Sequence, residues 1–294
     1  MSKLTYEVAE HAFCLLTSGN ADWDTCLQQY APFSVSEPAS QPVFELEAIA
    51  RGAQLAPAVE GFTEEQRQSD EASVIIVGQV AHRPCFEFVL HGRLSARLTA
   101  TTDYRQGTVE LGTDPGYGLN NALMVMYALS TACSQTALFH ASVVGYRQRG
   151  YLFLGKSGTG KSTHSALWLK HIAGTELLND DNPVVRMVDG EPRVYGSPWS
   201  GKTPCYRNVV MPIGAIVSLS QAPYNAIHRL RSVEAYGVLM SSISGKRWDS
   251  RIADGLHETE SLLIAHTDMW HLACLPDREA ALMCCRQVTA GQPT

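Results

Sequence analysis

The sequence predicts an α/β protein whose amino-terminal part is rich in β-strands, and three observations support this class. Apolar and β-branched segments of strand length recur through the first 115 residues. A segment with apolar residues three and four positions apart then indicates a helix. Beyond it, strand-like and helix-like segments alternate, as they do in α/β folds. We therefore expect a β-rich subdomain over residues 1–115 and an α/β domain over residues 116–294.

The amino-terminal part is expected to consist of short strands and turns. Three prolines mark an early loop region, at Pro32, Pro38 and Pro42. Alternation of apolar and polar residues, or enrichment in β-branched residues, indicates the strands. The expected strands are 44–48, 73–80, 85–90, 94–102 and 108–111, with the third and fourth forming a hairpin.

The segment 118–136 is expected to be an amphipathic helix, and the strands and helices of the α/β domain follow it. The further expected strands are 138–145, 151–154, 183–188, 193–195 and 213–219, and the helices are 163–173, 232–242 and 278–288. The turn at 147–150 is so short that the strands on either side of it must be antiparallel neighbours.

Composition limits the function classes. The chain has 294 residues, 45% hydrophobic residues and a net charge of −6, which argues against electrostatic binding to nucleic acid or an anionic membrane. The eight cysteines form no Cys-x-x-Cys pair, so zinc is not expected. No signal segment is visible, and the most apolar stretch, 122–133, is too short to span a bilayer. These features predict a cytoplasmic protein without nucleic-acid or membrane partners.

Residues 155–162 read Gly-Lys-Ser-Gly-Thr-Gly-Lys-Ser, the pattern of a phosphate-binding loop. A strand before it and a helix after it would aim backbone N–H groups and the positive helix end at phosphate. The motif predicts a nucleoside triphosphate, expected to be ATP, with Lys161 at its β- and γ-phosphates and Ser162 on Mg²⁺. The expected binding residues are Gly155, Ser157, Gly158, Thr159, Gly160, Lys161, Ser162 and Thr163. A dinucleotide fingerprint fits worse, because Thr163 stands where that motif needs a glycine or alanine.

A second motif follows the predicted loop helix, where the apolar residues Leu177 and Leu178 lead to Asp180 and Asp181. A carboxylate at a strand end can hold Mg²⁺ opposite the loop. Two adjacent acids also allow one to face the metal while the other accepts a proton from an attacking hydroxyl. The alternative is a solvated turn before Pro183.

The stretch 195–204 is expected to be a loop, because it is rich in glycine, serine and proline. Trp199 is a candidate contact residue, and Lys202 and Arg207 are candidates for binding phosphate or a substrate carboxylate. An ordinary hairpin connection with a core tryptophan explains the pattern equally well.

These motifs together resemble HPr serine kinase/phosphorylase and its HPr-kinase-like relatives. The resemblance rests on His140-Ala141-Ser142, on residues 155–163 and on Leu178-Asn179-Asp180-Asp181, and it covers about residues 135–290. It implies the phosphate-loop core of the HPr kinase C-terminal domain, a fold group that includes ATP-dependent phosphoenolpyruvate carboxykinase. In that group a hairpin leads into the loop, as the short turn at 147–150 also predicts.

The resemblance also implies roles for individual residues. Lys161 and the loop amides would bind phosphate, and Ser162 and Asp181 would hold Mg²⁺. Asp180 would be the general base, and His140 would lie beside the triphosphate or the base. Without the resemblance, a histidine in a strand such as His140 is more simply explained as a core residue.

The resemblance implies a kinase that transfers the γ-phosphoryl group of ATP to a hydroxyl, with serine expected, on a protein, peptide or small molecule. The recognition signature of HPr kinases proper is missing after the acidic pair, so HPr itself and the reverse phosphorylase reaction are not expected. A non-catalytic ATP-binding regulatory module is one alternative. A carboxykinase-like enzyme is another, although its further metal site and arginine clamp are not found. HPr kinases form hexamers, so the resemblance also implies a homo-oligomer.

Overall fold

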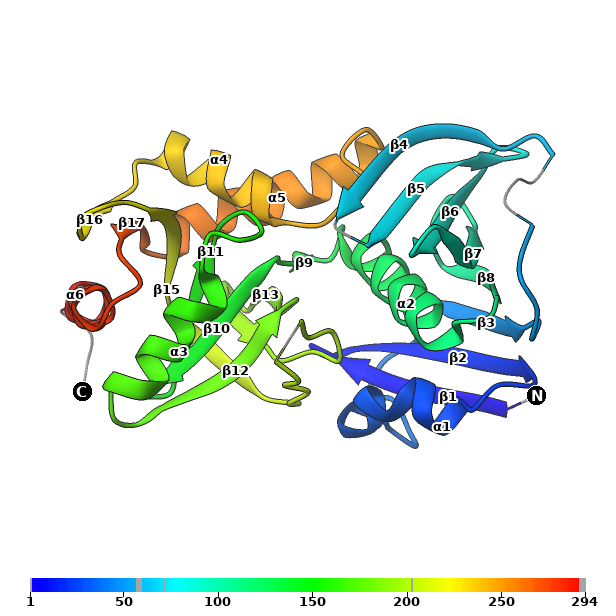
Figure 1. The fold of residues 1–294 in the computed structure, drawn as a ribbon, viewed down its shortest axis with the longest axis horizontal. Helices are drawn as coiled ribbons and strands as arrows, with labels where there is room; N and C mark the ends of the chain where they lie inside the picture. Colours follow the sequence, from blue (N-terminus) through cyan, green and yellow to red (C-terminus); the bar gives the residue numbers. More distant parts are fainter. Residues whose placement is uncertain (1, 57–59, 71, 202, 291–294) are drawn as a thin grey trace. The chain divides into compact units, whose positions relative to one another are not determined.

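The computed structural model describes residues 2–56, 60–70, 72–201 and 203–290. It divides the chain into two compact units, Met1–Thr131 and Ala132–Thr294. Both units combine strands and helices, which confirms the mixed α/β class (Figure 1). Each unit is built around a sheet of its own.

The first unit is an eight-stranded sheet in the order β1-β2-β3-β8-β7-β6-β5-β4. Its strands are β1 (Ser2–Val8), β2 (His11–Gly19), β3 (Glu45–Ala50), β4 (Thr63–Asp70), β5 (Ser73–Val80), β6 (Arg83–Leu90), β7 (Arg93–Ala100) and β8 (Gln106–Leu111). Its helices are α1 (Trp23–Leu27), the 3-10 helix η1 (Gln28–Phe33) and α2 (Pro115–Thr131). The predicted hairpin of β6 and β7 is confirmed by their antiparallel pairing.

Helix α2 packs on strands β3, β6, β7 and β8 of this sheet. The approach is close at Gly118, where an added Cβ would lie 2.5 Å from the Cβ of Ala96. The helix therefore belongs to the first unit, and the two units divide at its end, between Thr131 and Ala132. The sequence predicted this division at 115/116, before the helix. The glycines of 112–118 mark the start of this helix and its contact with the sheet.

A buried ion pair joins β6 to β7 in the first unit. Two nitrogens of Arg97 lie 2.9 and 2.6 Å from Oε1 of Glu87, and the side chains are only 9% and 6% exposed. We expect Arg97→Met to lower the free energy of unfolding by about 3 kcal/mol, because it leaves a buried carboxylate without its partner. Chemical denaturation measures this. The control is Arg67→Met in the exposed pair with Glu64, which should cost much less because solvent screens that pair; equal losses would contradict the expectation.

The second unit contains nine strands, with β15 shared between two sets of pairings. One set has the order β12-β10-β11-β15-β17-β16, and the other runs β15-β14-β13-β9. The strands are β9 (Thr136–Leu138), β10 (Ala141–Tyr146), β11 (Arg149–Leu154), β12 (Thr175–Asp181), β13 (Val184–Val188), β14 (Glu191–Tyr195), β15 (Val210–Gln221), β16 (Ala226–Arg229) and β17 (Met269–Cys274). Strand β15 runs parallel to both β11 and β17.

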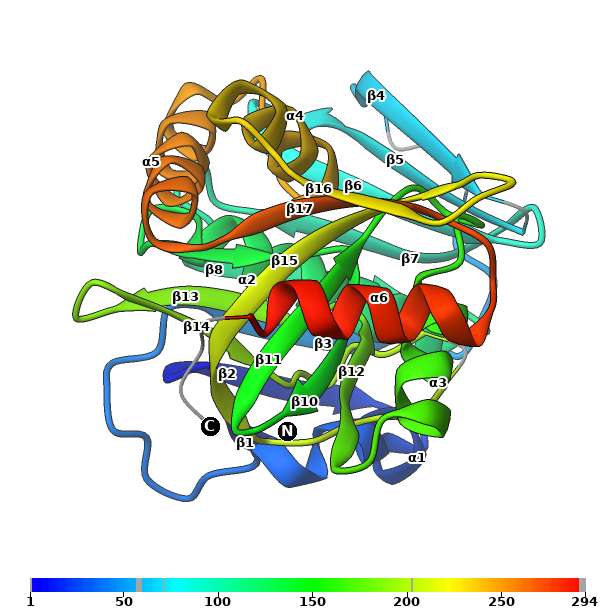
Figure 2. The same ribbon diagram turned by 90° about the vertical axis from the view of Figure 1, so that its left-hand side faces the viewer.

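The described residues of the second unit also form four helices (Figure 2). They are α3 (Lys161–His171), α4 (Ser232–Ser242), α5 (Ser250–His266) and α6 (Arg278–Val288). Helices α3 and α6 contact each other and bury Trp168 and Cys284 in a core with Phe153 and Val217 of the sheet. On the other side, α4 packs on α5, and α5 contacts β9, β13 and β14.

The hairpin predicted before residues 155–162 is confirmed, since β10 and β11 pair in antiparallel register. Arg147 and Gln148 turn the chain with φ angles of 49° and 59°, as a two-residue hairpin requires. The strand expected over 138–145 is instead divided into β9 and β10. The division arises because the N–H of His140 donates to the carbonyl of Ser242 at the end of α4, 2.7 Å away, and so leaves the sheet pairing.

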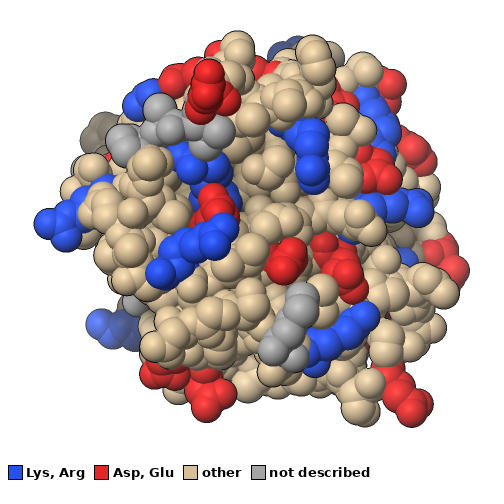
Figure 3. Space-filling view, turned by 90° about the vertical axis from the view of Figure 1, so that its right-hand side faces the viewer, with Lys and Arg blue, Asp and Glu red and all other residues tan. Residues whose placement is uncertain are grey.

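Acidic and basic side chains are interspersed on the face drawn in Figure 3, and the coloured residues there form no continuous basic surface. Among the residues that the structure describes, no helix has the length and apolar character needed to cross a bilayer.

Candidate phosphate-binding site

The loop between β11 and α3 has the backbone shape that its glycines predict. Gly158 and Gly160 have φ angles of 78° and 106°, which side chains with a Cβ rarely adopt. Thr159 closes the loop, since its N–H and its hydroxyl both donate to the carbonyl of Lys156, at 3.1 and 2.7 Å. Helix α3 starts from Gly160, which has no side chain to cap it. The N–H groups of its first turn are thus presented at the loop, where an anion would be stabilised.

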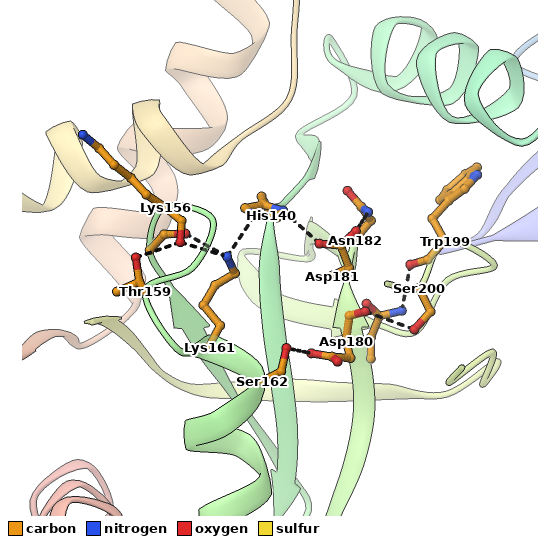
Figure 4. Close-up of polar contacts among 12 residues, drawn as sticks. His140, Lys156, Thr159, Lys161, Ser162, Asp180, Asp181, Asn182, Trp199 and Ser200 are labelled. Carbon is orange, nitrogen blue, oxygen red and sulfur yellow. Dashed lines mark hydrogen bonds and ion pairs between the residues drawn. The ribbon is translucent and has the colours of Figure 1, made fainter. Parts of the chain in front are cut away.

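The side chain of Lys161 lies at the centre of the site (Figure 4). Its ammonium contacts Nε2 of His140 at 2.8 Å and donates to the carbonyls of Gly155 and Lys156 at 2.9 and 3.4 Å. Burial lowers the pKa of Lys161, and the nearby charges of Asp181 and Asp180 oppose that shift. The ammonium of Lys161 therefore lies in a partly dehydrated position beside the loop.

A chain of polar contacts leads from Lys161 through His140 to Asp181. Nδ1 of His140 lies 3.0 Å from Oδ1 of Asp181. Since the Lys161 ammonium can only donate, Nε2 of His140 must accept, and the network assigns the ring proton to Nδ1. Asp181 also accepts a bond from Asn182 at 2.7 Å and has a φ of 132°, an unusual backbone angle for a non-glycine residue.

The other acid of the pair faces the loop helix. The hydroxyl of Ser162 donates to Oδ1 of Asp180 at 2.9 Å, and Asp180 is buried with 4% exposure. Alternation along β12 explains the direction: Asp180 is opposite Ser142, whose hydroxyl contacts Ser165 of α3 at 2.6 Å. The sequence resemblance implied that Ser162 and Asp181 would hold Mg²⁺ together. The structure pairs Ser162 with Asp180 and leaves Asp181 to His140.

The segment after β14 braces the acidic pair, which the sequence did not predict. Asn179 is fully buried and donates to the hydroxyl of Ser197 at 3.1 Å. The carbonyl of Asp180 accepts from the hydroxyl of Ser200 at 3.0 Å and from the N–H of Gly201 at 2.6 Å. The glycine and serine residues of 195–204 could have indicated this contact, because small residues allow the segment to approach the end of β12 closely.

Two of the candidate substrate residues, Trp199 and Arg207, have their contacts within the protein. The indole of Trp199 is 1% exposed, so it acts as a core residue and is not presented to a ligand. Arg207 donates to the carbonyl of Leu177 and to the carboxylate of Glu176, both at 2.7 Å. It therefore fixes the first half of β12 and is already paired. Lys202 lies outside the described residues.

The donor set fits a magnesium ion held jointly by protein and phosphate. Mg²⁺ prefers oxygen ligands and is usually bound by one or two protein groups plus substrate phosphates. Asp180 and Ser162 supply a carboxylate and a hydroxyl in contact, beside the first turn of α3. In the described part of the chain, no three His, Cys, Asp or Glu side chains gather as a set that would hold a metal ion without a further ligand.

His164, on the first turns of α3, is buried and neutral. Trp168 Nε1 donates to its Nε2 at 3.1 Å, and burial lowers its pKa from 6.5 to about 4. Below about pH 6.5 the unfolded chain takes up a proton here that the folded chain refuses, so stability falls as the pH falls. Between about pH 7.5 and about pH 4.5, we expect wild type to lose roughly 2–3 kcal/mol more unfolding free energy than His164→Gln. Denaturant titrations at both pH values measure this, and parallel losses would contradict it.

No family model matches the sequence, and no curated protein matches it. Among solved structures, the HPr(Ser) kinase/phosphatase from Coxiella burnetii is similar to this chain with a TM-score of 0.29 and 12% sequence identity. The match covers 50% of this chain and 90% of the other.

Proposed function

We propose that the protein is an ATP- and Mg²⁺-dependent kinase that transfers the γ-phosphoryl group to a hydroxyl, with serine the expected acceptor. The observation that carries the proposal is the convergence of two polar contacts on one loop. Lys161 contacts His140, which contacts Asp181, and Ser162 contacts Asp180. A phosphate cradle, a cation and two carboxylates with different neighbours are the groups that phosphoryl transfer needs.

Each residue of the site has a part in the proposed reaction. The loop amides and Lys161 bind the phosphates and offset their charge. Asp180 and Ser162 would hold Mg²⁺, which would supply positive charge to offset that of the phosphates. Asp181 takes the proton of the acceptor hydroxyl, and His140 holds its carboxylate in place. Asp181 suits this part because its side chain is 35% exposed and an acceptor can reach it.

This assignment exchanges the roles that the sequence resemblance implied for the acids. The exchange rests on contact: the metal-binding hydroxyl of a phosphate loop and its partner carboxylate share one cation, so they should lie side by side. Asp180 satisfies this condition with Ser162. Asp181 is instead held by His140 and Asn182.

The test measures transfer of the labelled phosphoryl group from γ-labelled ATP to candidate acceptors. We expect Mg²⁺-dependent transfer to serine hydroxyls in a panel of free serine and serine-containing peptides, recovered as acid-stable phosphoserine. The Asp181→Asn protein is the control for background labelling. Tight ATP binding without transfer to any hydroxyl would favour a regulatory module. Transfer to a carboxylic acid would favour the carboxykinase-like alternative, which the pairing of Arg207 with Glu176 does not support.

A further inference from the structure

A cavity of about 740 Å³ adjoins the phosphate loop on the α3 side of the sheet. Its floor includes Gly158, Thr159 and Gly160 of the loop, so it is continuous with the phosphate cradle. Its far wall is formed by the turns that follow β15, the parallel neighbour of β11, and β17, the parallel neighbour of β15. Ligands of α/β sheets bind in such crevices outside the carboxyl ends of parallel strands.

The walls of this cavity are apolar and uncharged. Apart from the loop, the lining consists mainly of Leu167, Leu219, Pro223, Leu275 and Pro276. The lining contains no Asp, Glu, Lys or Arg among the described residues, and Nε2 of its one histidine, His164, already accepts a hydrogen bond from Trp168 Nε1 at 3.1 Å. Such walls disfavour a further phosphate or a carboxylate and favour a flat ring with a few polar edges.

Hydrogen bonds hold the far wall in place. Asn225 accepts from the N–H of Leu275 at 2.8 Å and donates to Asp277 at 3.1 Å. Asp277 in turn caps α6, and the N–H of Ala222 donates to the carbonyl of Cys274 at 3.1 Å. The two turns are thus tied together, and a preformed wall lowers the entropy cost of binding a ligand against it.

A second cavity, of about 550 Å³, lies on the opposite side of the loop and differs in chemistry. Its lining includes Lys156 and five serines: Ser157, Ser218, Ser220, Ser241 and Ser242. The side chain of Gln221 lines both cavities and donates to the carbonyl of Gly158 at 3.1 Å. Serine hydroxyls thus mark the second cavity, whereas leucine and proline side chains form most of the first beyond the loop.

We propose that the apolar cavity binds the nucleobase and ribose of the nucleoside triphosphate, with the base between Leu167 and the Leu275–Pro276 wall. The inference rests on the proposed function, because it needs the triphosphate in the loop. Thr163 and Gln221 supply the polar groups for the ribose and the base edge.

Two cysteines make the proposal testable in the wild-type protein. Cys274 lines the apolar cavity and is half-buried, while Cys133 is exposed and outside it. The six other thiols are buried. At alkaline pH with iodoacetamide, we expect Mg-ATP at ~10 times its Kd to slow alkylation of Cys274 about tenfold, read by mass spectrometry of its peptide. Inorganic tripolyphosphate should not slow it, and Cys133 should respond to neither ligand.

The outcomes separate this proposal from the proposed function. ATP that binds in a Lys161-dependent manner without protecting Cys274 would overturn the base site and leave the phosphate site standing. Protection by tripolyphosphate equal to that by ATP would also overturn it, since the base would then contribute nothing. Absence of any ATP binding would overturn both.

A matched pair of variants gives an independent measurement. Leu275 and Leu169 are both 39% exposed, but only Leu275 lines the cavity. We expect Leu275→Asn to raise the Kd for ATP about tenfold and to leave that for tripolyphosphate within about twofold. Leu169→Asn should change neither. Equal effects of the two variants on ATP would overturn the proposal.

Discussion

Lys161→Ala is expected to abolish nucleotide-dependent phosphoryl transfer, with kcat/KM lowered by about 10³-fold or more. The ammonium is the one cation that the described structure places among the loop carbonyls, His140 and the acidic pair. Its removal leaves the developing charge on the phosphates without an offset in a partly dehydrated site. It also leaves His140 without its partner at Nε2.

Initial rates of label transfer at several ATP concentrations measure this effect. Lys170→Ala is the matched control, because Lys170 is an exposed lysine at the other end of the same helix. The control should keep transfer within about twofold of wild type. Substantial turnover in the Lys161→Ala protein would remove the loop from the reaction and with it the assignment of the site.

The second large effect separates the two acids. Asp181→Asn should lower kcat by about 10²–10⁴-fold and leave Mg-ATP binding nearly unchanged, because in the proposed reaction this residue acts on the acceptor. Asp180→Asn should also stop turnover, but it should weaken ATP binding in Mg²⁺ and remove the dependence of binding on Mg²⁺. The sequence resemblance predicts the reverse pattern for the two variants.

Calorimetric titration of ATP with and without Mg²⁺, together with transfer rates, distinguishes the assignments. Asp254→Asn, in α5, serves as a charge-matched control. If Asp180→Asn kept Mg-dependent binding while Asp181→Asn lost it, the contact between Ser162 and Asp180 would not report the metal site, and the original roles would stand.

Much of the second unit could be predicted because its local signals agree with its tertiary structure. Helix α6 spans Arg278–Val288, the range that the sequence predicted, and the side chain of Asp277 caps its start. The hairpin before the loop was predicted from the length of its turn alone. The loop residues are brought together by local geometry, so sequence spacing was sufficient there.

Other elements gave misleading patterns. All residues of β4 are exposed, so this edge strand shows no alternation to detect. Helix α5 buries Gly255, Thr259 and Glu260 beside its leucines, which hides the apolar stripe. The sequence could not show which of the two acids faces Ser162. Asp180 and Asp181 are adjacent in sequence, and only the register of β12 with β10 decides between them.

Strand β10 lies between β11, which carries the loop, and β12, which carries the acids. The distance between the loop after β11 and the acids of β12 is therefore set by two interstrand spacings of about 4.8 Å, which main-chain hydrogen bonds maintain. This spacing depends on the backbone of β10 and not on which side chains β10 carries. Sequences could then diverge widely in this unit, replacing most of the hairpin, while the reach from phosphate to carboxylate stays constant.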